Sequence, residues 1–200
     1  MITYRWTRLD VPMADINFTV DVPRGQERFR ELVLYVSKRC ADDDTFGATM
    51  LNKILYYADF QAYERLGMPL TGVPYFRIKN GPAPFHVMKV RRDLVEEGAL
   101  LIKEVPYGNY VQHRSVALRE ADLSLFSKGE LEIVDQVIEA LSGKTATKIS
   151  FESHKIAWHV LGDKERIPYE AAFFSDEGAT AVDTKEARRL NEKYGWELRI

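Results

Sequence analysis

The sequence predicts an α+β fold that is predominantly α-helical: a helical bundle around a central helix at about residues 46–66, with a small antiparallel sheet or hairpin. The first observation is that apolar residues recur at helical spacing over most of the chain. The second is a pair of β-rich runs, 99–105 and 110–118, joined by Pro-Tyr-Gly-Asn, which is typical of a hairpin. No internal repeat or low-complexity linker divides the chain, so we expect one domain.

The predicted central helix holds the least ordinary stretch of the sequence. At about 100° per residue, apolar and aromatic side chains interrupt every face, so we expect the rest of the chain to surround this helix. Asn52, Tyr56, Asp59 and Tyr63 share one stripe, and Lys53 lies on another. Because buried charges need partners, we expect Lys53 and Asp59 each to be satisfied inside the fold.

The chain before the central helix divides into two parts. Residues 1–23 are predicted to form a strand-like N-terminal extension, and residues 24–200 the domain. A first helix is predicted at about 26–41, and the acidic run 42–44 would end it as a solvated loop. Within the extension the residues that alternate as in a strand are Ile16, Phe18, Val20 and Val22.

After Gly67, which suits a helix C-cap, residues 73–79 form a predicted strand that could complete a small sheet with the hairpin. Residues 80–84 contain two prolines and are expected to break regular structure before a helix at 85–97. The basic residues of that helix are read as a solvated face: Lys89, Arg91 and Arg92.

The rest of the chain is predicted to contain three helices, with an irregular stretch that begins at residues 167–169 and precedes the last helix. Ser127 and Glu130 have the spacing of a capping box, which predicts a helix that ends near Leu141. Two further helices are expected at 151–161 and 184–194, each followed by a glycine.

The composition excludes several classes of protein. A net charge of −2 gives no reason to expect a nucleic-acid or membrane-surface partner, and we expect neither. There is no secretory signal and no apolar run long enough to span a bilayer. The single cysteine, Cys40, suits a reducing compartment, so we expect a cytoplasmic protein.

The sequence offers little catalytic or metal-binding chemistry. His154 and His159 are five residues apart, so they point about 140° apart on a helix and cannot share a metal ion. Lys53 and Asp59 point about 120° apart on theirs, which favours two structural charges over an acid–base pair. A small hydrolase or transferase built around Lys53, Asp59 and His154 is the weaker alternative. We therefore expect no enzyme, no cofactor and no metal.

Four pieces of the sequence together resemble a known family, over about residues 26–165. Residues 51–59, Leu-Asn-Lys-Ile-Leu-Tyr-Tyr-Ala-Asp, resemble the signature helix of the Panacea domain of SocA-like antitoxins, and residues 67–72 are similar to the turn that follows it. Tyr75 with residues 81–84, and later Ser150, His154 and Trp158, are similar to its other motifs. The motif residues that could form scaffold or bind toxin are Lys53, Tyr56, Tyr57, Asp59, Thr71, Gly72, Tyr75, Gly81, Pro82, His154 and Trp158.

The resemblance implies a bacterial or phage antitoxin of a type II toxin–antitoxin system, which binds and neutralises a co-encoded toxin. An alternative in the same family is a proteolytic adaptor, which delivers its toxin to a cytosolic AAA+ protease. If one domain serves many toxins, the contact surface should vary while the buried centre stays fixed. We therefore expect the motif residues to form the scaffold, and the toxin to contact exposed loops, the hairpin at 99–118 or the N-terminal arm.

Overall fold

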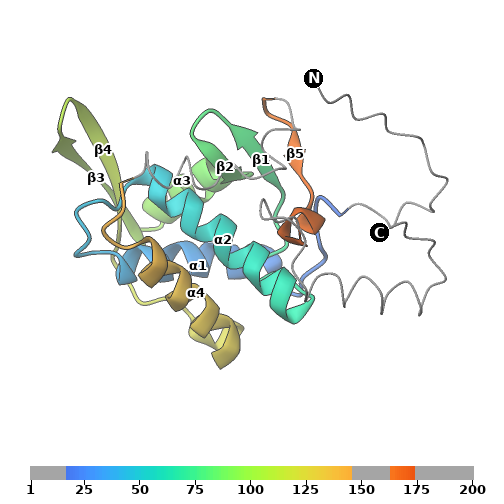
Figure 1. The fold of residues 1–200 in the computed structure, drawn as a ribbon. Helices are drawn as coiled ribbons and strands as arrows, with labels where there is room; N and C mark the ends of the chain where they lie inside the picture. Colours follow the sequence, from blue (N-terminus) through green and yellow to red (C-terminus); the bar gives the residue numbers. More distant parts are fainter. Residues whose placement is uncertain (1–16, 146–162, 174–200) are drawn as a thin grey trace, which may run out of the picture.

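A computed structural model of the chain describes residues 17–145 and 163–173 (Figure 1). Helix α2 (Ala48–Leu66) lies at the centre, and it contacts α1 (Gly25–Arg39) and α4 (Lys128–Leu141). It also contacts strand β2 (Gly81–Pro84) and the short 3₁₀ helix η2 (Tyr169–Phe173). Helix α3 (Val87–Glu96) and a second short 3₁₀ helix, η1 (Leu123–Leu125), complete the helical part. The predicted α+β class, with helices around a central one, is confirmed.

Local signals in the sequence set where the helices begin and end. Gly67 follows α2 at φ 73°, a left-handed conformation that costs glycine little, and its N–H donates to the Tyr63 carbonyl oxygen. Ser127 and Glu130 form the predicted capping box at the start of α4. Both helices bury their apolar stripe in one core, which includes Leu51, Ile54, Leu55, Ala58, Val134 and Val137.

The strands form two separate sheets. The first has the order β2–β1–β5, with β1 at Tyr75–Ile78 and β5 at Arg166–Ile167, and both pairings are antiparallel. The second is the predicted hairpin of β3 (Leu100–Tyr107) and β4 (Tyr110–Ala117), which projects from the helices in Figure 1. The expectation that strand 73–79 might complete the sheet of the hairpin was wrong, because β1 pairs with β2 and β5 instead.

Residues 80–84 were expected to break regular structure, but residues 81–84 form strand β2. Pro82 lies opposite Arg77, whose N–H and C=O both bond on the other side of β1, toward residues 164–165. Pro82 therefore occupies a position that needs no N–H for the ladder. Since β2 is the edge of its described sheet, the prolines are tolerated there.

Residues 17–22 were predicted to be part of a strand, and they are irregular. Two backbone hydrogen bonds tie them to distant parts of the domain: the Val20 N–H donates to the Gly72 carbonyl oxygen at 3.2 Å, and the Tyr169 N–H donates to the Asn17 carbonyl oxygen at 2.9 Å. The Asn17 side chain also donates to Glu170 Oε1 at 2.8 Å. The segment crosses the turn before β1 instead of pairing along a strand. Residues 1–16 of the predicted strand-like extension and the helices expected at 151–161 and 184–194 lie outside the described residues.

Asp43 and Arg91, which were both predicted to be solvated, are less exposed to solvent than expected. Asp43 is half-buried, and its Oδ1 accepts from the N–H and the hydroxyl of Thr45, both at 2.7 Å. Arg91 is 7% exposed, and its Nε donates to Ser115 Oγ at 3.0 Å. Lys89 and Arg92 are exposed as expected.

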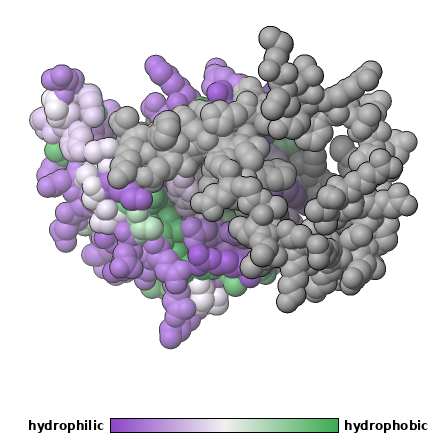
Figure 2. Space-filling model, viewed as in Figure 1, coloured by the Kyte–Doolittle hydropathy of each residue, from purple (hydrophilic) through white to green (hydrophobic). Residues whose placement is uncertain are grey.

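One face of the described part is visible in Figure 2. On the face shown in Figure 2 hydrophilic residues dominate, with a smaller hydrophobic area near the middle. None of the helices in residues 17–145 and 163–173 is long and apolar enough to cross a membrane. In the same residues no group of three or more His, Cys, Asp or Glu is placed to hold a metal ion.

Candidate functional site

Asp59 is the centre of a buried hydrogen-bond network. Its side chain is fully buried on α2, and Oδ1 accepts from the Thr71 N–H at 2.8 Å. Oδ2 accepts from the Thr71 hydroxyl, and from the Tyr75 hydroxyl at 2.9 Å. The Tyr75 hydroxyl is also 2.9 Å from the Leu55 carbonyl oxygen, so its one proton has two available acceptors. The network joins α2, the turn before β1, and β1 itself.

Burial has the largest effect on the pKa of the Asp59 carboxyl. It raises the pKa of Asp59 to about 6, against the opposing effect of the hydrogen bonds from Thr71 and Tyr75. Burial beside the same carboxylate raises the pKa of Tyr75 well above its ordinary value. Tyr75 therefore stays a neutral donor while Asp59 is ionised at neutral pH.

Aromatic rings enclose the Asp59 network. Phe60 lies 4.9 Å from Tyr169 in a stacked arrangement and packs edge-on against Tyr75, with ring centroids 5.5 Å apart. Tyr56 packs edge-on against Tyr75 at 5.6 Å. Tyr63 lies 5.4 Å from Tyr169 at the outer end of the cluster. Such pairs add about 0.5–1.5 kcal/mol each beyond the burial of their area.

Tyr169 is a member of this cluster that sequence reasoning missed. It lies in η2, and its hydroxyl donates to the Val73 carbonyl oxygen at 2.7 Å and lies 3.5 Å from Asp59 Oδ2. Tyr169 and Asp59 are 110 positions apart in the chain. No periodicity or spacing in the sequence indicates this contact.

Lys53 is fully buried as predicted, on a different side of α2 from Asp59. Burial lowers the pKa of the Lys53 ammonium to about 8. Because both side chains are 0% exposed, no substrate in solvent reaches either group in this structure. The arrangement gives no support to a hydrolase or transferase site built on these two residues.

Gly72 has a steric role next to the network. Its φ is 71°, and an added Cβ would lie 2.0 Å from the carbonyl oxygen of Val20. Any other residue there would collide with the backbone of the segment that crosses the turn. Gly72 and Thr71 therefore act together: Thr71 anchors the turn to Asp59, and Gly72 lets residues 17–22 pack over it.

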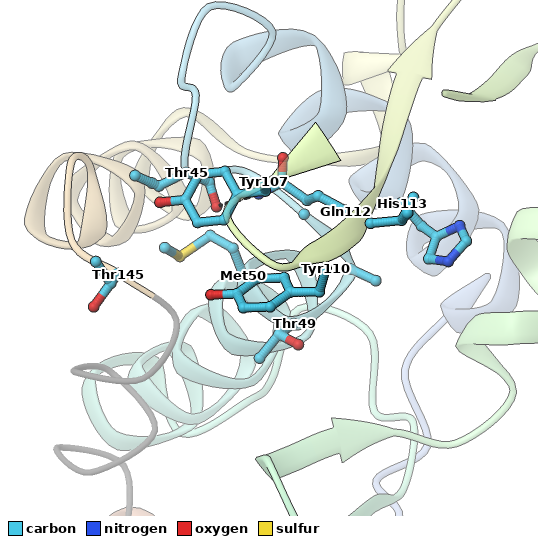
Figure 3. Close-up of a pocket in the computed structure, with 11 residues that line it drawn as sticks. Thr45, Thr49, Met50, Tyr107, Tyr110, Gln112, His113 and Thr145 are labelled. Carbon is cyan, nitrogen blue, oxygen red and sulfur yellow. Dashed lines mark hydrogen bonds between the residues drawn. The ribbon is translucent and has the colours of Figure 1, made fainter. Parts of the chain in front are cut away.

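A surface hollow lies between the hairpin and the start of α2. Its volume is about 290 Å³, and its lining includes Met50, Tyr107, Tyr110 and Gln112. In Figure 3 the two tyrosines reach from the hairpin toward Met50 and Thr49 of α2, while the His113 ring points away from them. Gln112 Nε2 donates to the Thr45 carbonyl oxygen at 3.1 Å, which ties the hairpin to the loop before α2.

The model of the antitoxin SocA-like, Panacea domain family matches residues 51–159. The chain belongs to this family. No curated protein and no solved structure gives a significant match. The Panacea match begins within α2 and runs through strands β1 and β2 of the first sheet, α3, the hairpin and α4, and it ends before β5. It therefore includes Asp59 and Tyr75, and it stops before Tyr169.

The structure brings together about half of the predicted Panacea motif residues. Those in the buried network or against it are Tyr56, Asp59, Thr71, Gly72 and Tyr75. Lys53 is buried elsewhere on α2, and Tyr57 is half-buried with its ring edge-on to Tyr56. Gly81 and Pro82 are buried in β2, which packs on α2. His154 and Trp158 lie outside the described residues.

Proposed function

We propose that this Panacea domain is the antitoxin of a type II toxin–antitoxin system, and that it neutralises a co-encoded toxin by binding it directly in the cytoplasm. The observation that carries this proposal is the family match over residues 51–159. The proposal includes no catalytic step and no cofactor. What remains for the domain is recognition of another protein through its surface.

The geometry of the motif supports a division between scaffold and surface. Lys53, Asp59 and Tyr75 are all completely buried, and the polar atoms of Asp59 are directed at Thr71 and Tyr75. A toxin could contact these groups only if the core opened, which would leave several donors without acceptors. The motif therefore supports binding by holding the fold, while exposed elements make the contacts.

The hairpin is the exposed element best suited to make them. Tyr110 and Val111 at its tip are 64% and 53% exposed, and the hollow beside them can receive a side chain. Tyrosine is enriched among the residues that dominate binding energy at interfaces. Strand β4 is anchored to the rest of the domain, because Ser115 is buried and Gln112 bonds to the loop before α2.

Co-expression tests the proposal directly. The reading frame next to the gene for this chain is induced alone and together with the chain, in a host whose growth is recorded. We expect growth arrest with the neighbour alone and restored growth with both. Repeating the rescue in a strain without its AAA+ proteases separates direct neutralisation, which persists there, from a proteolytic adaptor, which does not act. Arrest that the chain never relieves would contradict the proposal.

A further inference from the structure

A second hollow, here called the α3–hairpin groove, lies between α3 and the hairpin. Its volume is about 560 Å³, and the residues that line it are Ala48, Met88, Arg91, Arg92, Val95, Glu96, Ile102 and His113. Half of these are apolar. Met88 is 73% exposed and Val95 is 38% exposed, one on each side of Arg91 along α3. The groove therefore combines apolar side chains with two arginines, one glutamate and one histidine.

Arg91 is the unusual member of the groove because its charge is buried without a carboxylate. Within residues 17–145 and 163–173 its side chain makes one hydrogen bond, from Nε to Ser115 Oγ at 3.0 Å. Nη2 is shielded from solvent and has no hydrogen-bond partner among the described residues. Burying a cation in this state is costly, and most buried charges in proteins are paired.

The nearest acidic residues of the same helix are already engaged with other cations. Asp93 pairs with Lys89 at 2.6 Å, and Glu96 lies 3.8 Å from Arg92. No ion pair to Arg91 occurs within residues 17–145 and 163–173. Burial alone lowers the pKa of the Arg91 guanidinium, and no neighbouring acid raises it. Because Arg91 lines the groove, a carboxylate from another molecule that entered it would compensate the buried positive charge.

We propose that the α3–hairpin groove receives an acidic side chain of the toxin, flanked by apolar residues, and that Arg91 pairs with that carboxylate. This inference rests on the proposed function above. A carboxylate matches the charge of Arg91, and hydrogen bonds between charged groups are about twice as strong as neutral ones. Apolar residues beside it would cover Met88 and Val95, and the unbranched methionine side chain adapts to differently shaped partners.

The chemistry of the groove favours a protein segment over a nucleic acid. A nucleic-acid site needs several cations along an open, polar surface, and this chain has a net charge of −2. Here one guanidinium lies deep beside apolar side chains, which suits a short acidic and apolar segment of a protein. A partner seated in this way would exclude water from the pair and so strengthen it.

The test is isothermal titration of the purified chain with the product of the neighbouring gene. The main variant is the double substitution Arg91→Met and Ser115→Ala, which removes both members of the internal hydrogen bond and leaves neither unpaired. We expect it to bind about 30-fold more weakly or worse, as when one member of a buried charge pair is removed. We also expect it to melt at or above the wild-type temperature, because an unpaired buried cation has been replaced by an apolar side chain.

A second variant covers the case in which the double variant does not fold. Met88→Glu places a negative charge on an exposed position in the groove, where it should repel the incoming carboxylate and weaken binding about tenfold or more. Met68→Glu is the matched control, since Met68 is also exposed (46%) but lies in the turn after α2. It should bind as the wild type does.

The outcomes separate the two proposals. If the wild type binds the toxin and the variants bind within about threefold of it, the groove is not the site and the proposed function stands. If Met68→Glu weakens binding as much as Met88→Glu does, the groove assignment is likewise overturned. If the wild type does not bind at all, both proposals fail. Weaker binding by the groove variants alone, with unchanged or higher melting temperatures, supports the pairing.

Discussion

Replacing Asp59 with asparagine should alter how the stability of the protein depends on pH. Burial raises the pKa of this carboxyl from 3.8 to about 6 in the folded state. Between these two pH values the folded protein keeps a proton that the unfolded chain has released. Stability contributed by this group is therefore fully present below about pH 4, and it is lost as the pH rises toward about 6. Asparagine has no such titration.

The size of the effect follows from the difference between the two pKa values. They differ by roughly two pH units, and each unit corresponds to about 1.4 kcal/mol. The free energy of unfolding of the wild type, relative to Asp59→Asn, should thus fall by about 3 kcal/mol between acidic and neutral pH. Asparagine keeps an oxygen for the Thr71 N–H, and the Tyr75 hydroxyl can donate to the Leu55 carbonyl oxygen instead. The variant should therefore still fold.

Urea unfolding of the wild type and of Asp59→Asn, at several pH values from about 3.5 to 7, measures this difference in the free energy of unfolding. Subtracting one protein from the other cancels the carboxyls that the two share. A difference that stays constant across the range would refute the reasoning. So would a difference that changes in the opposite direction, because it would mean that the hydrogen bonds from Thr71 and Tyr75 outweigh burial and hold the pKa below 3.8.

Three other substitutions test the local structure by thermal and urea unfolding. Asp59→Ala leaves the N–H and hydroxyl of Thr71 without an acceptor, so it should lower the free energy of unfolding by about 2–5 kcal/mol. The folded variant should still bind toxin. A stable variant that cannot bind toxin would contradict the scaffold role. Gly72→Ala should lower the free energy of unfolding by more than about 1 kcal/mol, because φ is 71° and the Val20 carbonyl oxygen blocks the position of the added Cβ. Wild-type stability in this variant would show that the turn can move. Ser127→Ala should cost about 1 kcal/mol through loss of the capping box, and Ser127→Asp should keep most of it.

The elements of the fold that were predicted correctly are those whose signals come from residues close together in the sequence. Helix α2 was placed to within about two residues because its apolar spacing and Gly67 are local signals. The start of α4 follows in the same way from Ser127 and Glu130, and the hairpin from its turn residues. The burial of Lys53 and Asp59 was also predictable, since aromatic residues occupy every side of their helix.

The parts that were missed depend on contacts between distant segments. Proline at 82 argues against a strand until it is known that the strand is an edge and that Arg77 bonds on its other side. Tyr169 completes the Asp59 cluster from 110 positions away. Arg91 has the same local pattern as its exposed neighbours, and only the packing of the hairpin against α3 buries it. Tertiary packing decided each of these cases, and a single sequence carries no local record of it.

The central claim is that this chain neutralises a toxin by binding it, with a buried scaffold that presents an exposed surface. The most direct measurement is titration of the purified chain into the purified product of the neighbouring gene, in buffer that contains no protease, while the activity of that product is followed. Direct neutralisation predicts a saturable complex and a loss of toxin activity in proportion to the amount of complex formed. Two results would contradict direct neutralisation: unchanged toxin activity at a saturating concentration of the chain, or the absence of a complex although the chain rescues growth in cells.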